Sequence, residues 1–182
     1  MVTLEAILER NNLNRAYKQV KANRGGPGVD GMTVDEFLDY LRAHAVEIVE
    51  TVKAGKYKPQ PVRRVMIPKE EKGKFRPLGI PTAVDRVIQQ AIAQKLSDEY
   101  EPVFSLHSHG FRPCRSCRTA IDEALDIANQ GYVWVVDLDL SKFFDTVNHS
   151  KLLQLLSDKL KERASEILCP WDNRSPPNGC IQ

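Results

Sequence analysis

The sequence predicts an α+β fold in which amphipathic helices accompany one short hairpin and one apolar strand. Three observations support this prediction. Apolar residues recur at helical spacing in five segments, at residues 3–22, 33–54, 82–100, 116–130 and 149–160. Two β-rich runs, 62–67 and 75–80, flank a charged turn and predict a hairpin. The run 132–140 is rich in β-branched and aromatic residues and predicts a central strand.

Local signals mark where the helices begin and end. Thr3 is a candidate N-cap for the first helix, and Thr33 with Glu36 has the spacing of a capping box for the second. A glycine-rich loop at 23–31 separates these two helices, and Gly55 ends the second. Beyond Leu160 the periodicity fades, so residues 161–182 are predicted to be an irregular tail.

The overall composition excludes several classes of protein. The 182 residues carry a net charge of only +2, and 42% of them are hydrophobic. A globally basic nucleic-acid coat, an acidic disordered tail and a low-complexity chain are therefore excluded. No apolar run approaches the length of a membrane span, and the N-terminus lacks the apolar core of a signal peptide, so we expect no membrane partner. Four cysteines are too few for a disulfide scaffold, and we expect a cytoplasmic protein.

The small net charge hides a concentration of basic residues around the predicted hairpin. Between Lys53 and Arg76, nine Lys and Arg residues are opposed by only two Glu residues. Such a stretch can neutralise phosphates, although it could also be an ordinary solvated face. A second basic cluster favours a groove for a polyanion, and it consists of Arg112, Arg115 and Arg118.

Acidic residues interrupt the predicted central strand. Asp137 and Asp139 lie two residues apart, so a strand would direct both side chains to the same face, and Asp145 follows six residues after Asp139. These acids could cap the strand and the next helix, or they could bind Mg²⁺, which prefers carboxylate and carbonyl oxygens. Paired Mg²⁺ ions drive phosphoryl transfer, but one strand alone cannot complete such a site.

Several blocks of the chain, in the same order, resemble group II intron reverse transcriptases, which are also called maturases. Matching blocks extend over about residues 5–160, which makes the resemblance far more specific than a single motif. The blocks are Gly28-Val29-Asp30-Gly31 in the N-terminal extension, Ile67-Pro68-Lys69, Phe75 to Thr82 and Asp85 to Ala91 in the fingers, His109 to Pro113 in the next block, and Val136 to His149 as motif A of the palm.

The resemblance implies a domain organisation as well as a fold. It implies a helical N-terminal extension, a fingers β-hairpin with packed helices, and the first part of a ferredoxin-like reverse-transcriptase palm. The corresponding boundaries are 1–54 for the extension with its glycine-rich loop, 55–130 for the fingers, 131–160 for the partial palm with motif A, and 161–182 for the tail.

The resemblance also implies which residues carry out the chemistry. Asp139 is expected to be the catalytic carboxylate that coordinates Mg²⁺, with the backbone carbonyl of Leu140 as a further ligand. Phe144 is expected to lie under the sugar and reject a 2′-hydroxyl group. Asp137 is interpreted as a structural or supporting residue.

Four further residues are expected to bind the substrates of an RNA-directed DNA polymerase. Lys69 and Arg76 would hold the triphosphate of the incoming dNTP, and Phe111 and Arg112 would line the channel for the RNA/DNA template-primer. An ammonium and a guanidinium on adjacent hairpin strands make a cationic clamp. Positioning and charge neutralisation supply most of the catalysis in phosphoryl transfer.

The chain departs from the family pattern in one respect, since it contains no Tyr-x-Asp-Asp tetrapeptide, which supplies the remaining catalytic Asp residues. We therefore expect fingers and a partial palm that cannot polymerise DNA alone. Mg²⁺-dependent primer extension by the purified chain would contradict this expectation. An incomplete palm would also expose apolar surface, which makes a homodimer plausible.

Alternative functions are compatible with the same residues. One is a non-catalytic maturase module that binds group II intron RNA through its basic fingers, and another is a reverse transcriptase of the retron or diversity-generating class. The Gly28 to Gly31 block favours the intron type. A zinc site is a further alternative that we do not favour, because the family block already explains its setting, and it would use His107, His109, Cys114 and Cys117.

Overall fold

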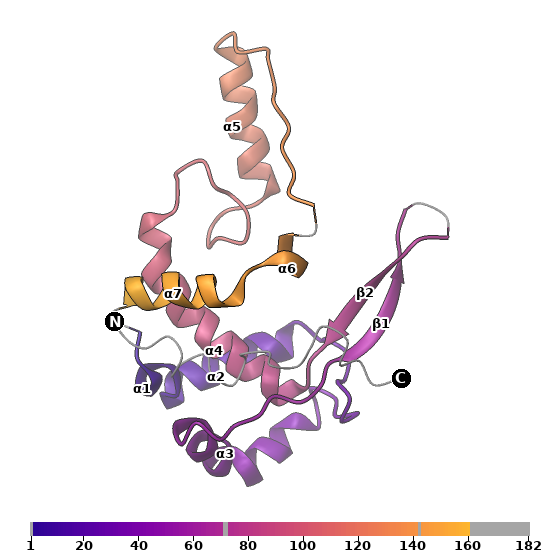
Figure 1. Cartoon of the computed structure of the whole chain (residues 1–182), viewed down its shortest axis with the longest axis vertical. Coiled ribbons are helices and arrows are strands. Elements are labelled where there is room, and N and C mark those ends of the chain that lie inside the picture. The colour runs from indigo at the N-terminus through magenta and orange to yellow at the C-terminus, as the bar shows by residue number, and fades with distance from the viewer. Residues whose placement is uncertain (1, 71–72, 142, 161–182) are drawn as a thin grey trace. The chain divides into compact units, whose positions relative to one another are not determined.

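The structure is a computed structural model that describes residues 2–70, 73–141 and 143–160 (Figure 1). These residues form two compact units. The first contains the described residues up to Leu96 together with those from His149, and the second runs from Ser97 to Asn148. The tail predicted at 161–182 lies outside the described residues. None of the described helices is both long and apolar enough to cross a lipid bilayer.

The N-terminal segment forms two helices, α1 (Leu4–Ile7) and α2 (Arg10–Ala22), where the sequence predicts one. Thr3 caps α1 as predicted, because its hydroxyl accepts a hydrogen bond of 3.1 Å from the backbone N–H of Ala6. The side-chain amide of Asn12 donates to the carbonyl of Ile7 at 2.8 Å and so satisfies a backbone group at the end of α1. A polar side chain that is itself buried therefore accounts for the interruption.

The Thr33 and Glu36 pair predicted as a capping box forms its reciprocal hydrogen bonds, but the helix begins at Phe37 rather than near Thr33, and its N-cap Glu36 makes no side-chain cap bond. The carboxylate of Glu36 accepts hydrogen bonds from the backbone N–H and the hydroxyl of Thr33, at 2.9 and 2.8 Å. These bonds lower the pKa of Glu36. Helix α3 (Phe37–Lys53) follows and ends before Gly55, which has a positive φ of 65°.

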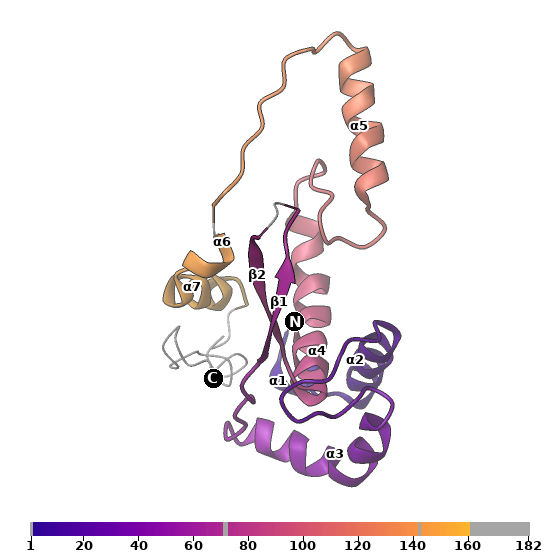
Figure 2. The ribbon, with the colours of Figure 1, turned by 90° about the vertical axis from the view of Figure 1, so that its right-hand side faces the viewer.

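The core of the first unit is built from buried residues of α2, α3 and α4 (Ala83–Tyr100). Asn12 joins α2 to α4, since its amide donates to the carbonyl of Ala91 at 3.0 Å and its carbonyl accepts from Gln94 at 2.9 Å. Figure 2 shows α2 and α4 side by side. The buried apolar residues on these three helices are Ala16, Val20, Phe37, Val52, Ala83, Val87, Ile88, Ala91 and Ile92.

The predicted hairpin is confirmed to within one residue. Strand β1 (Arg63–Pro68) pairs antiparallel with β2 (Phe75–Ile80), and Arg63 lies opposite Ile80 in the register. Figure 1 shows the pair as a twisted ribbon. The backbone N–H of Lys69 donates to the carbonyl of Lys74 at 2.8 Å, which extends the ladder beyond the ends of the strands.

The second unit contains a short 3₁₀ turn, η1 (Glu101–Val103), followed by α5 (Cys117–Asn129) and α6 (Phe143–Thr146). Ser116 caps α5 and forms a capping box with Thr119. None of the described residues between Ser97 and Asn148 is buried. Helix α7 (His149–Leu160), which matches its prediction, belongs to the first unit.

The prediction of a central strand at 132–140 is wrong for this structure. These residues have no regular secondary structure, and Figure 2 shows them as an extended segment after α5. Trp134 is 94% exposed, and the other apolar side chains of the segment are also exposed. A strand needs a hydrogen-bonded neighbour, and within the described residues only β1 and β2 form a sheet. The α+β class is confirmed, whereas the ferredoxin-like part of the palm stays a prediction.

Candidate nucleic-acid interface and active site

The hairpin carries its predicted binding residues on one face. Paired residues of an antiparallel ladder share a face, and alternate pairs point to opposite faces. The register places Arg76 opposite Ile67, and the Lys69–Lys74 bond continues the alternation, so that Lys69 and Arg76 lie on the same side. Arg63 belongs to this face as well, whereas Arg64 lies on the other. We call the face with Arg63, Lys69, Lys74 and Arg76 the cationic face.

The base of the hairpin is attached to α4 through a buried carboxylate. Asp85 is only 1% exposed and lies in the first turn of α4. Its carboxylate accepts hydrogen bonds from the hydroxyl of Tyr57 at 2.7 Å, the hydroxyl of Thr82 at 2.6 Å and the backbone N–H of Gln60 at 3.2 Å. Tyr57 and Gln60 precede β1 and Thr82 follows β2, so one carboxylate connects both ends of the hairpin to the helix.

The environment of Asp85 keeps the Tyr57 hydroxyl protonated, so that it can donate its hydrogen bond. Burial and the hydrogen bond to Asp85 raise the pKa of Tyr57 above its ordinary value. The position of Asp85 at the N-terminal end of α4 also favours a negative charge there. The buried carboxylate of Asp85 is therefore an acceptor whose hydrogen bonds are made, rather than an isolated buried charge.

The glycine-rich loop packs against the same end of α4. A Cβ atom at Gly28 would lie 2.7 Å from the Cα atom of Thr82, so only glycine fits this close approach. One guanidinium nitrogen of Arg86, Nη2, donates to the carbonyl of Gly26 at 3.0 Å. Burial lowers the pKa of Arg86, and the nearby charge of Asp30 opposes that shift. The loop that resembles the family's N-terminal extension is thus held beside the hairpin base.

In the second unit Arg112 organises the loop between α4 and α5. Its side chain is 7% exposed, and its Nη2 atom donates to the carboxylate of Glu101 at 2.8 Å. The Nη1 atom donates to the carbonyls of Ser105 and Ser108 at 2.6 and 2.9 Å. The guanidinium also lies 5.3 Å from the ring centre of Phe104. Arg112 is therefore engaged within its own loop, and its expected contact with a template-primer stays a prediction.

The neighbouring Phe111 is fully exposed. It has a positive φ of 55°, an unusual backbone conformation for a bulky residue, and its ring projects into solvent. The Arg112 contacts hold the adjoining backbone in place. An exposed aromatic ring on a fixed loop is suited to stacking against a base.

Two glutamates of the second unit are expected to titrate below the ordinary pKa of 4.5. Hydrogen bonds from Arg112 lower the pKa of Glu101, and hydrogen bonds from His107 and His109 lower that of Glu123. Each carboxylate therefore stabilises the fold fully above 4.5, and this contribution is lost as the pH falls through the lowered pKa. An NMR titration of the side-chain carboxyl carbons measures both midpoints.

The substitution Arg112→Gln provides the control for this titration. It removes the guanidinium beside Glu101, so the Glu101 midpoint should return to the ordinary value while that of Glu123 stays low. A Glu101 midpoint at or above 4.5 in the unaltered chain would contradict the expectation.

The residues of the zinc alternative are arranged differently from a metal centre. His107 and His109 both bond to Glu123, and the Nε2 atom of His109 lies 2.6 Å from its carboxylate. Cys114 and Cys117 are exposed free thiols. In the described part of the chain, no three His, Cys, Asp or Glu side chains are grouped so that they could hold a metal ion.

The residues of motif A lie along the extended segment and at α6. Asp137, Asp139 and Leu140 are exposed, and Phe144 is 87% exposed with its ring 5.4 Å from that of Phe143. The carboxylate of Asp139 and the carbonyl of Leu140 are hard oxygen donors of the kind that Mg²⁺ prefers. Two such donors are fewer than the six that Mg²⁺ requires, so the described residues do not assemble a magnesium site by themselves.

Of the predicted site residues, Lys69 and Arg76 lie on the same face of the hairpin. The others lie in the second unit, and they are Phe111, Arg112, Asp139, Leu140 and Phe144. The structural roles of Asp85 and Arg112 were missed by sequence reasoning. A signal for Asp85 existed, because an acidic residue between Val84 and Val87 interrupts the apolar face of a helix.

Comparison with known proteins shows the family to which the chain belongs. Residues 67–167, more than half of the chain, match the family model described as reverse transcriptase (RNA-dependent DNA polymerase). That region begins in β1 and includes β2, α4, α5 and the motif A segment. The chain belongs to the reverse transcriptase family.

Several relatives are named after introns, and one of them is a group II intron-encoded protein. The chain is 40% identical to the group II intron-encoded protein LtrA of Lactococcus lactis over 81% of its length, and 34% identical to an uncharacterised 91 kDa protein in the cob intron of Schizosaccharomyces pombe over 86%. It is 32% identical to nuclear intron maturase 1 of Arabidopsis thaliana over 46%. The matches span 24%, 19% and 12% of those proteins. The chain is thus a group II intron reverse transcriptase or maturase sequence that spans a quarter or less of these relatives.

Proposed function

We propose that this chain forms the fingers and the first part of the palm of an RNA-directed DNA polymerase encoded by a group II intron. The observation that carries the proposal is the cationic face of the hairpin, which lies largely within the region matched by the family. Four basic side chains on one face of a two-stranded ribbon suit the phosphates of RNA or of a nucleotide.

Each substrate contact is assigned to a residue of the fingers or motif A. Lys69 and Arg76 hold the triphosphate of the incoming dNTP, and Phe111 stacks against the template-primer. Arg112 acts by fixing the loop that carries Phe111, in line with its bonds to Glu101 and two backbone carbonyls. Phe144 excludes a 2′-hydroxyl group.

The proposed metal ligands are Asp139 and the carbonyl of Leu140. They would hold Mg²⁺, which neutralises charge in phosphoryl transfer. The described residues do not group enough ligands to complete the site, so further ligands must come from other groups. We therefore propose that the 182 residues alone bind RNA but do not extend a primer.

Removal of one cation from the cationic face should weaken RNA binding. In the absence of dNTP the whole cationic face is free to contact RNA phosphates. Under that condition we expect Arg76→Ala to lower the affinity for group II intron RNA and to reduce the slope of log K against log salt by about 0.7, because one phosphate contact is lost. Fluorescence anisotropy across a series of salt concentrations measures both quantities.

The matched control is Arg64→Ala, which removes the same charge from the opposite face of the same strand pair. We expect it to leave the salt slope unchanged. Equal losses in the two variants would mean that the hairpin attracts RNA only through its total charge, and the assignment of a binding face would then be wrong.

A second function, a non-catalytic RNA-binding module, is favoured by the cationic face, because Lys and Arg side chains bind RNA phosphates without a metal ion. Primer extension by a chimaera, in which the remainder of the Lactococcus lactis relative follows this chain, separates the two functions. An active chimaera supports the polymerase, whereas an inactive one that still binds intron RNA supports the module. The cytoplasmic location and the homodimer stay predictions.

A further inference from the structure

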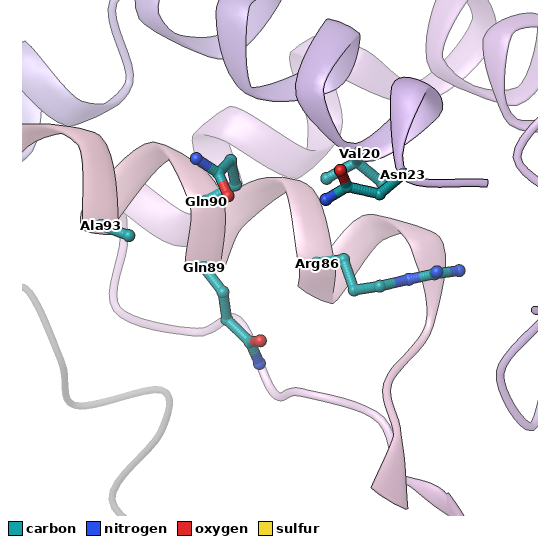
Figure 3. A pocket seen from close by; sticks show the side chains of 6 residues that line it. All are labelled: Val20, Asn23, Arg86, Gln89, Gln90 and Ala93. Carbon is teal, nitrogen blue, oxygen red and sulfur yellow. The ribbon is translucent and has the colours of Figure 1, made fainter. Parts of the chain in front are cut away.

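A cavity of about 260 Å³ lies between the C-terminal end of α2 and α4 (Figure 3). Val20, which is buried, is one of its lining residues, and the others offer carboxamides, a guanidinium and a methyl group. No carboxylate occurs among the described residues that line it. They are Val20, Asn23, Arg86, Gln89, Gln90 and Ala93.

Arg86 occupies a constrained position at this cavity. A Cβ atom at Gly25 would lie 2.3 Å from its Nη1 atom, and its Nη2 atom donates to the carbonyl of Gly26. The loop therefore encloses one end of the guanidinium. The Nε atom is buried and has no hydrogen-bond partner among the described residues. A buried donor without an acceptor is unfavourable, so the Arg86 guanidinium keeps hydrogen-bonding capacity that the described residues do not use.

The surroundings of the cavity add positive charge. Arg24 follows Asn23 directly, and the Nη2 atom of Arg63 lies 3.4 Å from the position that a Cβ atom would take at Gly26. Asp30 is the acidic residue that acts on Arg86. Arg63 also belongs to the cationic face, so the cavity and that face share a neighbouring cation.

We propose that this cavity binds one unpaired nucleobase of an RNA strand, with the adjoining phosphates near Arg24 and Arg63. The proposal rests on the proposed function, since it assumes that the chain binds RNA. Carboxamides offer both a donor and an acceptor to the edge of a base, and a guanidinium donates to a base or stacks on it. A cavity of this size is below the range of about 300–1,000 Å³ of drug-sized sites, which suits a single base. The base must be unpaired, because pairing hides its edge.

The test compares two short RNAs, a single strand that contains 2-aminopurine and a duplex of the same sequence. The variants are Asn23→Ala/Gln90→Ala, which removes two carboxamides, and Ala93→Leu, which fills the cavity from an exposed position. Gln130→Ala, which removes an exposed carboxamide outside the cavity, is the control. Circular dichroism verifies that each variant is folded.

We expect both cavity variants to weaken single-strand binding about tenfold and to abolish the change in 2-aminopurine fluorescence. The duplex affinity and the salt slope should not change, because no charge is removed. Equal losses on both RNAs, or no loss on either, would overturn the proposal. The proposal would also be overturned if AMP bound the unaltered chain as tightly as the single strand does. If the unaltered chain binds neither RNA, the proposed function fails as well, whereas normal RNA binding by both variants refutes the cavity alone.

Discussion

The substitution Asp85→Ala should destabilise the first unit by about 3 kcal/mol or more. It leaves the hydroxyls of Tyr57 and Thr82 and the N–H of Gln60 without their buried acceptor. Each unsatisfied buried donor costs about 1–3 kcal/mol. Since a domain of this size is stable by only about 5–15 kcal/mol, the loss is a large fraction of the total. Urea unfolding followed by circular dichroism measures it.

Three other substitutions separate the contributions to this effect. Tyr57→Phe removes one hydrogen bond and should cost about 1 kcal/mol, whereas Asp85→Asn keeps the shape but offers fewer acceptors and should fall between the two. Asp98→Asn alters an exposed acid on the same helix and should change stability by less than about 0.5 kcal/mol. An Asp85→Ala variant that is as stable as Asp98→Asn would show that the network does not hold the hairpin.

The Asp85 network also links stability to function. It joins the segments before β1 and after β2 to the start of α4, and these contacts set the direction in which the hairpin leaves the helix. Lys69 and Arg76 lie at the far end of that hairpin. A loosened base would therefore reduce RNA binding even though Asp85 touches no ligand, and the loss should be smaller for Tyr57→Phe than for Asp85→Ala.

Features that depend on neighbouring residues could be predicted from the sequence. The hairpin and the Thr3 cap each depend on side chains only a few residues apart, and the structure confirms them. Two of the three partners of Asp85, Gln60 and Tyr57, lie 25 and 28 residues before it, so no local pattern indicates them. The bond between Asn12 and Ala91, 79 residues apart, escaped prediction for the same reason.

For the segment 132–140 the local composition predicted a strand that the structure does not contain. The composition favours a strand, but the described residues provide no neighbouring strand for it to pair with. β-Propensity describes how well side chains fit a paired, half-buried surface, and it has no effect without a neighbouring strand. The family resemblance implies that Arg112 lines a substrate channel, yet its charge is neutralised by Glu101 within the same loop. The family resemblance therefore indicates candidate site residues, but the sequence could not show which cations are already engaged within the fold.

The substitution Asp139→Asn should reduce DNA synthesis by about three orders of magnitude in an active chimaera with the Lactococcus lactis relative. It keeps the size of the side chain but removes the negative charge, which is the property that a divalent cation requires of its ligand. A loss of about 4 kcal/mol in transition-state stabilisation corresponds to this factor and fits the contribution of a metal ion to phosphoryl transfer. Steady-state primer extension measures the change in kcat.

Asp137→Asn is a matched control for this experiment, because both carboxylates are exposed in the same extended segment, two residues apart. If Asp137 has only a supporting role, its variant should lose less than about tenfold, within the range of an altered neighbour of a metal ligand. Equal losses would mean that the metal needs both carboxylates. Unchanged synthesis in Asp139→Asn would show that the motif A assignment is wrong, whereas full RNA binding in both variants would show that the cationic face acts independently of the metal ligands.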